Sequence, residues 1–135
     1  MSKIIVLTGA GGVLCSTMAK ALSEQGNKIA VLDLRVGAAN KVAEEIKAAG
    51  GDAIGVAANV LEKDSLEKAK QVVNNTFGKV DILVNGAGGN HPLGTTSNQF
   101  FAMEDLQNAT EGFKTFFDLD TKAVSYTHLT LPTKA

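Results

Sequence analysis

Several residue types on which common protein classes depend are scarce in this sequence. One cysteine, Cys15, among 135 residues excludes an intramolecular disulfide framework and a cysteine-rich zinc site, and we predict no metal site. The 13 Lys and Arg residues nearly balance the 14 Asp and Glu residues, so the charge does not favour a nucleic-acid partner or an anionic membrane surface. No apolar run is long enough to cross a bilayer, and no signal-peptide pattern follows Met1. These scarcities predict a soluble, cytoplasmic domain with no membrane and no nucleic-acid partner.

Glycine is the residue type present in excess, with 14 glycines against two prolines. The length fits one domain that buries roughly two-thirds of its unfolded surface, and the apolar content of 44% is typical of a globular protein. The glycines cluster, with groups at 9–12 and 86–89 that directly follow predicted strands.

Short apolar runs alternate along the chain with segments of helical periodicity. Runs that are apolar at consecutive positions predict buried strands at 4–7, 29–32, 53–58 and 80–84. Apolar residues at helical spacing predict helices at 13–25, 38–49 and 64–76. This alternation predicts an α/β fold, a Rossmann-type doubly wound parallel sheet that is incomplete, with about four parallel strands in the order 3-2-1-4.

The last third of the sequence loses this regularity. Residues 90–112 predict a surface loop, in which His91 is either solvated or in contact with a substrate. A helix is predicted to start near Thr121. Residues 125–135, SYTHLTLPTKA, show neither period and are similar to a translated vector or adapter sequence. We therefore predict an NAD-binding Rossmann-type region at 1–124 and a non-native or disordered tail at 125–135, with a natural tail as the alternative.

A glycine-rich loop lies between the first predicted strand and the first predicted helix. In this loop Gly9 and Gly12 allow the backbone to approach a pyrophosphate, and the helix N-terminus supplies oriented N–H groups. Asp33 ends the second strand, where a carboxylate can accept both ribose hydroxyls of an adenosine and repel a 2′-phosphate. Arg35 offsets that repulsion only in part, so the remaining repulsion still favours NAD over NADP. A tight turn and a strand-end cap are the alternative interpretations of the loop and of Asp33.

Four segments resemble the short-chain dehydrogenase/reductase superfamily: Thr8-Gly9-Ala10-Gly11-Gly12, Asp33, Asn59-Val60 and Leu83-Val84-Asn85-Gly86-Ala87-Gly88. The sequence departs from the superfamily pattern at each motif except Asp33. Val13 and Cys15 stand where the pattern has glycine, Asn59 stands where it has Asp, and Gly86 stands where it has Asn. Together these departures resemble the branch that contains D-mannonate oxidoreductase (fructuronate reductase).

The resemblance implies cofactor-binding roles for residues that follow the four strands. Gly9, Gly12, Val13 and Leu14 would face the pyrophosphate and the nicotinamide half, Asp33 would hold the adenosine ribose, Asn59 and Val60 would flank the adenine, and Asn85, Gly86 and Ala87 would pass under the cofactor. The resemblance also implies an NAD-dependent oxidoreductase that acts on a CH-OH group, with a sugar acid such as D-mannonate or fructuronate as substrate. The intact enzyme would bind this small molecule as a homo-oligomer.

The chemistry of this superfamily needs a Ser and a Tyr-x-x-x-Lys pair, which relays a proton while hydride moves. The single tyrosine here is Tyr126, and position 130 is Thr130, so we predict no catalytic residue in this chain. The interpretation is an N-terminal, cofactor-binding half that is inactive alone. Two alternatives share the glycine loop and Asp33: a non-catalytic NAD-binding module and an S-adenosylmethionine methyltransferase.

Overall fold

The computed structural model describes residues 1–88, 118 and 122–130. Strands and helices alternate through the first 85 residues, and one further helix follows near the end of the chain. The elements are β1 (Ile4–Thr8), α1 (Val13–Glu24), β2 (Lys28–Asp33), α2 (Val36–Ala48), β3 (Asp52–Ala57), α3 (Lys63–Thr76), β4 (Ile82–Asn85) and α5 (Ala123–Thr130).

The four strands form one parallel sheet in the order β3-β2-β1-β4. This order and the flanking helices confirm the predicted Rossmann-type α/β fold. The register pairs Thr8 with both Leu32 and Asn85, and it pairs Asp33 with Ala57. Because the pairing is parallel, the carboxyl ends of all four strands, and the loops that follow them, meet at one edge of the sheet.

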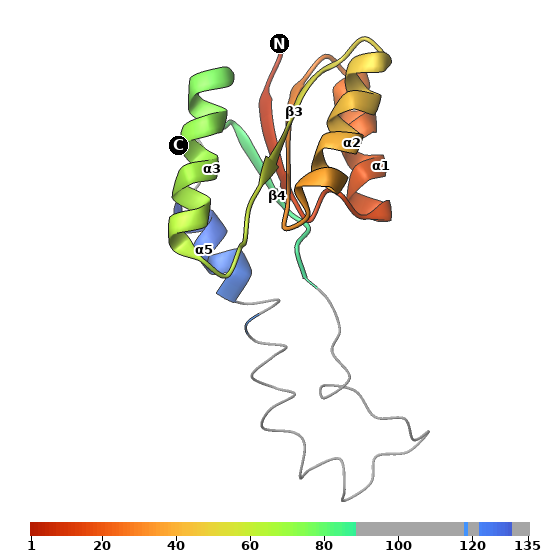
Figure 1. Cartoon of the computed structure of the whole chain (residues 1–135). Helices are drawn as coiled ribbons and strands as arrows, with labels where there is room; N and C mark the ends of the chain where they lie inside the picture. The colour runs from red at the N-terminus through yellow and green to blue at the C-terminus, as the bar shows by residue number, and fades with distance from the viewer. Residues whose placement is uncertain (89–117, 119–121, 131–135) are drawn as a thin grey trace, which may run out of the picture.

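Helices cover both faces of the sheet, with α1 and α2 on one side and α3 and α5 on the other (Figure 1). Successive residues of β1 point into different cores. Ile5 and Leu7 pack in the cluster that contains residues of α1 and α2, whereas Val6 packs with Leu66 of α3 in the second cluster. This double coverage is why the strands are apolar at consecutive positions.

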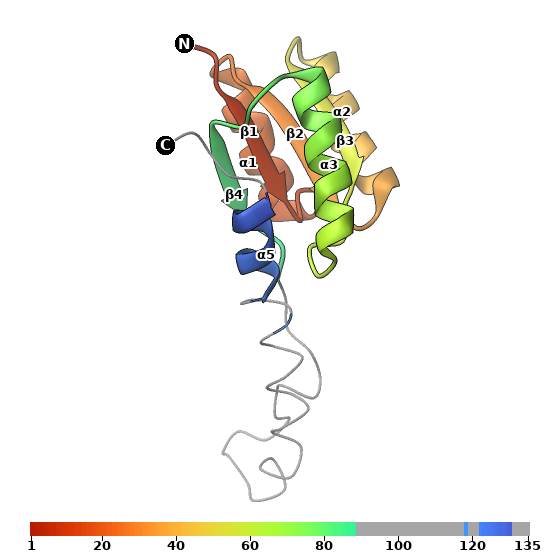
Figure 2. The same cartoon turned by 90° about the vertical axis from the view of Figure 1, so that its left-hand side faces the viewer.

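Helix α5 lies beside α3 on the second face (Figure 2). Tyr126 packs against the core cluster that contains α3, and Thr127 is fully buried, with its hydroxyl donating to the Ala123 carbonyl at 2.7 Å. The helix crosses the boundary predicted at residue 124, and a foreign origin for 125–135 stays a prediction. The predicted loop at 90–112, with His91, lies outside the described residues.

Among the elements of the first 85 residues, two start two residues away from their predicted starts, and the other bounds agree to within one residue. Helix α2 begins at Val36 rather than at residue 38, because the Arg35 carbonyl already accepts the N–H groups of Ala38 and Ala39 at 3.1 Å each. Strand β4 begins at Ile82 rather than at residue 80; just before it, the Asp81 carboxylate accepts the Ile4 N–H and the Asp81 N–H donates to the Ile4 carbonyl, at 2.9 Å each. Apolar periodicity reports neither set of hydrogen bonds.

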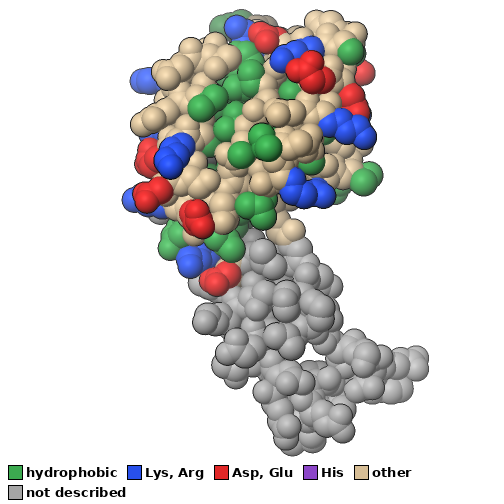
Figure 3. All heavy atoms as spheres, viewed as in Figure 1, with side chains coloured by type: hydrophobic (Ala, Val, Ile, Leu, Met, Phe, Trp, Pro, Cys, Tyr) green, Lys and Arg blue, Asp and Glu red, His purple; other side chains and the backbone are tan. Residues whose placement is uncertain are grey.

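The outer surface of the described part carries charges of both signs. In Figure 3, Lys and Arg side chains are interspersed with Asp and Glu side chains, and apolar groups lie between them. Among the described residues, no helix has the length and apolar character needed to cross a membrane.

Candidate functional site

A cleft of about 360 Å³ opens at the carboxyl edge of the sheet. Loops that follow all four strands contribute to it. Its walls are formed by Gly9, Gly12, Asp33, Leu34, Arg35, Ala58, Asn59, Val60, Leu61, Gly86, Ala87 and Gly88. In open parallel sheets ligands bind in this position, outside the carboxyl ends of the strands.

The β1–α1 loop depends on glycine for its path. Gly9 has φ +65°, and a Cβ there would lie 2.7 Å from the Gly86 carbonyl oxygen and 2.9 Å from the Ala87 Cα. Gly12 precedes α1 as its extended N-cap residue, and no side chain caps the helix. The first-turn N–H groups of α1 therefore carry the partial positive charge that suits an anion such as a pyrophosphate.

Asp33 is fixed within the cleft by two backbone hydrogen bonds. Asp33 is only 8% exposed. Its Oδ2 accepts the Gly11 N–H at 3.0 Å, and its Oδ1 accepts the Arg35 N–H at 2.9 Å. The Arg35 Nε lies 3.5 Å from the same Oδ1, on a side chain that is 72% exposed. The carboxylate thus has one orientation, and it retains lone pairs that can accept further donors.

Thr8 holds the β4 loop against β1. Its side chain is buried, and its Oγ1 accepts the N–H of Gly86 at 3.1 Å and the N–H of Ala87 at 3.2 Å. Thr8 belongs to the first motif, but the sequence alone predicts no role for it. A hydroxyl residue at the end of a buried strand, directly before the glycine loop, is the signal that could have identified it.

Asn59 shapes the turn after β3. Its Oδ1 accepts the Leu61 N–H at 3.0 Å, and its backbone N–H donates to the Ser65 Oγ at 2.9 Å. These bonds close an Asx-type turn that places Val60 in the wall of the cleft.

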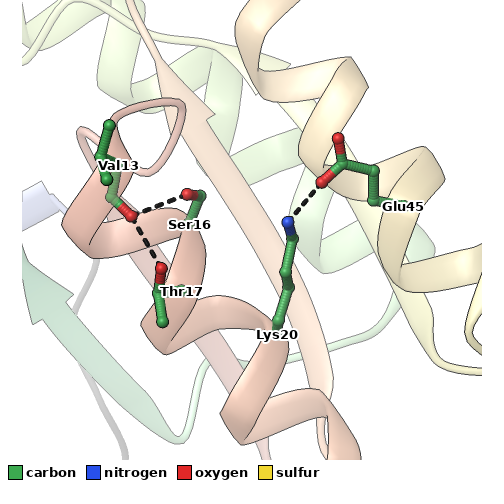
Figure 4. A network of polar contacts seen from close by, with 5 residues as sticks. All are labelled: Val13, Ser16, Thr17, Lys20 and Glu45. Carbon is green, nitrogen blue, oxygen red and sulfur yellow. Dashed lines mark hydrogen bonds and ion pairs between the residues drawn. The ribbon is translucent and has the colours of Figure 1, made fainter.

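The structure brings most of the predicted site residues together in this cleft. Gly9, Gly12, Asp33, Asn59, Val60, Gly86 and Ala87 all line it, whereas Val13, Leu14 and Asn85 do not. Val13 and Leu14 lie on the first turn of α1 and are 89% and 73% exposed. The Val13 carbonyl accepts the hydroxyls of Ser16 and Thr17 at 2.9 Å each (Figure 4). Cofactor contacts of these residues stay predictions.

A second cavity of about 310 Å³ lies where α1 and α2 end. Its most prominent interaction is the ion pair of Lys20 with Glu45, shown in Figure 4. The hydrogen bond from Lys20 and the nearby positive charges lower the pKa of Glu45 from its ordinary value of 4.5. Because these charges neutralise each other, this cavity is a weaker candidate than the cleft. Within the described part of the chain, no group of His, Cys, Asp and Glu side chains could hold a metal ion.

Comparison with known proteins gives consistent matches along the chain. A family model described as short chain dehydrogenase matches residues 3–132. An uncharacterized oxidoreductase of Haemophilus influenzae is 46% identical over 125 residues, which are 93% of this chain and 42% of that protein. The uncharacterized oxidoreductase UxuB of Bacillus subtilis is 47% identical over 120 residues, covering 89% of this chain and 41% of the relative.

Solved structures give the same picture. A protein from Haemophilus influenza assigned as a D-mannonate oxidoreductase, crystallised with bound NAD, superposes with a TM-score of 0.89 at 38% identity, covering 96% of this chain and 49% of that one. A hydroxysteroid dehydrogenase from Escherichia coli gives a TM-score of 0.74 at 27% identity, covering 96% and 50%. The chain therefore spans half or less of the length of these relatives.

Proposed function

The chain belongs to the short-chain dehydrogenase family, and from this premise we propose that its cleft binds NAD as the cofactor-binding part of an oxidoreductase that acts on a CH-OH group. The observation that carries the proposal is the position of Asp33, a fixed carboxylate beside an uncapped helix N-terminus in one cleft. NAD supplies the hydride acceptor in such chemistry, and this part of the chain supplies the binding surface.

The cleft residues fit a dinucleotide in the order of the strands. The α1 N-terminus at Gly12 suits the pyrophosphate, and Asp33, on the next strand of the sheet, suits the two hydroxyls of a ribose. The base then falls near β3, where Val60 and Leu61 line the cleft. Gly86 and Ala87, on the other side of β1, lie toward the nicotinamide half.

The fixed carboxylate favours NAD over NADP. Asp33 is held by Gly11 and by the Arg35 backbone, so it cannot turn away from a 2′-phosphate without losing two hydrogen bonds. The Arg35 guanidinium beside it offsets only part of the repulsion, because its side chain is largely exposed and screened by solvent.

Titration of the purified 135-residue chain with NAD and with NADP tests the proposal. The wild-type chain is expected to bind NAD more tightly, and Asp33→Ala is expected to remove the preference, with a loss of about 1–3 kcal/mol in NAD binding. Asp52→Ala, which removes an exposed carboxylate at the opposite end of the sheet, is the control for net charge. Equal affinity of the wild-type chain for both cofactors would contradict the proposed role of Asp33. If neither cofactor bound, the proposal that this cleft is the NAD site would be wrong.

The substrate of the intact protein is proposed to be a sugar acid of the D-mannonate or fructuronate type. The support is the branch resemblance and the assignment of the NAD-bound relative from Haemophilus influenza. The 135-residue chain is expected to bind NAD without oxidising this substrate, because its one tyrosine, Tyr126, is followed four residues later by Thr130 rather than Lys. NADH formation from D-mannonate above a mock-purified control would contradict this expectation.

A further inference from the structure

Cys15 and Gly86 lie 71 residues apart in the sequence and contact each other in the structure. Cys15 is in the first turn of α1, is 7% exposed, and has its Sγ 3.9 Å from the Gly86 carbonyl oxygen. A Cβ built on Gly86 would overlap this sulfur atom. The two residues therefore share one small volume, which only one of them can fill.

These are also two of the positions where the sequence departs from the superfamily pattern. Cys15 stands where the pattern has the smallest residue, and Gly86 stands where the pattern has an asparagine. A larger side chain in α1 thus coincides with the loss of a side chain after β4. Interiors are close-packed, so two such changes in direct contact affect each other's free-energy cost.

The pair also joins two walls of the cleft. Gly12, at the N-terminus of α1, forms one wall, and Gly86 with Ala87 forms another. Cys15 lies three residues after Gly12, and its sulfur contacts the Gly86 carbonyl oxygen. Cys15 itself is not among the residues that line the cleft. The Thr8 hydroxyl accepts the N–H groups of Gly86 and Ala87, whereas Cys15 contacts the carbonyl oxygen of Gly86.

We propose that Cys15 is a positioning residue for the cleft: its sulfur fills the space that Gly86 leaves and sets the spacing between the α1 N-terminus and the Gly86–Ala87 backbone. This proposal rests on the proposed function only for the ligand, NAD. The role belongs to the size of the sulfur, so neither the methyl group of alanine nor the smaller, polar hydroxymethyl group of serine fulfils it in full.

A double-mutant cycle with Cys15→Ala and Gly86→Ala tests the proposal. Alanine at 15 keeps the helix and removes only the sulfur, and the Cβ of an alanine at 86 would then lie 3.6 Å from the Cβ of residue 15, an ordinary contact. Its contact with the Thr8 carbonyl oxygen at 2.7 Å remains, so the rescue is partial. Unfolding midpoints and NAD dissociation constants are measured for all four proteins, at a temperature where each is folded.

We expect Gly86→Ala to weaken NAD binding about tenfold or more, Cys15→Ala to weaken it about fivefold, and the double variant to bind at least about threefold more tightly than additivity requires. Cys15→Ser should bind NAD between wild type and Cys15→Ala, since the hydroxyl fills only part of the space of the thiol and is polar at a buried position. Gly37→Ala is the control for the Gly-to-Ala change, because no atom lies within 4 Å of a Cβ at that position.

Additive effects on both measurements would overturn the reciprocal packing. Coupling in the unfolding midpoint with an unchanged NAD dissociation constant for Cys15→Ala would overturn the positioning role. A wild-type chain that fails to bind NAD overturns the proposed function instead, and non-additivity of the midpoints still decides whether the two residues share their volume.

Discussion

The backbone N–H of Gly11 donates to the Oδ2 of Asp33 at 3.0 Å, and a Cβ on Gly11 would lie 2.8 Å from that same oxygen. The Ala38 Cβ would lie 2.7 Å from the same added Cβ. The loop after β1 and the carboxylate after β2 therefore approach each other as closely as they do only because residue 11 has no side chain. The orientation of Asp33 is thus a property of the glycine loop as well as of β2.

Gly11→Ala is expected to destabilise the chain and to weaken NAD discrimination together. The added methyl group displaces either the Asp33 carboxylate or α2, at a cost of about 1–3 kcal/mol in unfolding free energy. The ratio of NADP to NAD dissociation constants should fall, because the carboxylate no longer has one orientation. Urea unfolding and cofactor titration measure the two effects. Gly37→Ala, a helical position where a Cβ meets no neighbour, should leave the discrimination unchanged and should not destabilise the chain, and equal behaviour of the two variants would contradict the mechanism.

Thr8→Val is expected to destabilise the chain more than Thr8→Ser. Valine keeps the shape of threonine but removes the oxygen that accepts the N–H groups of Gly86 and Ala87. Leaving them without an acceptor costs about 1–3 kcal/mol for each group that water cannot reach. Serine keeps the oxygen and loses only a methyl group, at about 1 kcal/mol.

Unfolding free energies of the two Thr8 variants check this order, and NAD titration reports whether the Gly86–Ala87 wall has moved. If Thr8→Ser were as destabilising as Thr8→Val, the methyl group rather than the hydroxyl would hold the loop.

The fold could be predicted because its signals are local. Consecutive apolar residues such as Ile5, Val6 and Leu7 report a strand covered on both sides, and helical spacing reports the segments that cover it. Once the strands are known to be parallel, the residues that follow them must share one edge. The prediction that Gly9, Asp33 and Gly86 lie near one another needs no further information.

The contacts that shape the cleft could not be predicted in this way. The Cys15–Gly86 contact, the Thr8 hydrogen bonds and the Gly11–Asp33 approach depend on the precise placement of segments 22 to 79 residues apart in the sequence. No periodicity carries that information. The shared volume of Cys15 and Gly86 was visible only as two separate departures from a pattern.

Lys20→Gln is expected to lower stability at neutral pH and to have less effect in acid. The hydrogen bond from Lys20 is the largest cause of the lowered pKa of Glu45, and burial opposes it. A lowered folded-state pKa means that the folded state binds the proton less readily than the unfolded chain. The contribution is therefore fully present above the ordinary value of 4.5 and is lost as the pH falls through the lowered pKa.

The difference in urea midpoint between wild type and Lys20→Gln should accordingly shrink between pH 7 and pH 3. The pair is exposed to solvent, so the difference is small and also falls at high salt. Lys68→Gln, on the exposed face of α3, removes the same charge and controls for the net charge of the protein. A difference in midpoint that stays constant over this pH range would show that Lys20 does not lower the pKa of Glu45.

Self-association through β4 is expected for the 135-residue chain. Strand β4 is the last strand of the described sheet, beside β1, and Ile82 on it is 42% exposed, whereas Ile29 and Val31 on β2 are fully buried. An exposed, apolar edge strand offers its backbone groups to another chain.

Ile82→Lys should reduce association, because a lysine on an edge strand opposes pairing with a second edge. Val72→Lys, at a residue of α3 that is 46% exposed, introduces the same charge away from the sheet and should leave association unchanged. Size-exclusion chromatography with light scattering at tens of micromolar compares the three proteins, and a monomeric wild-type chain that melts cooperatively would contradict the expectation.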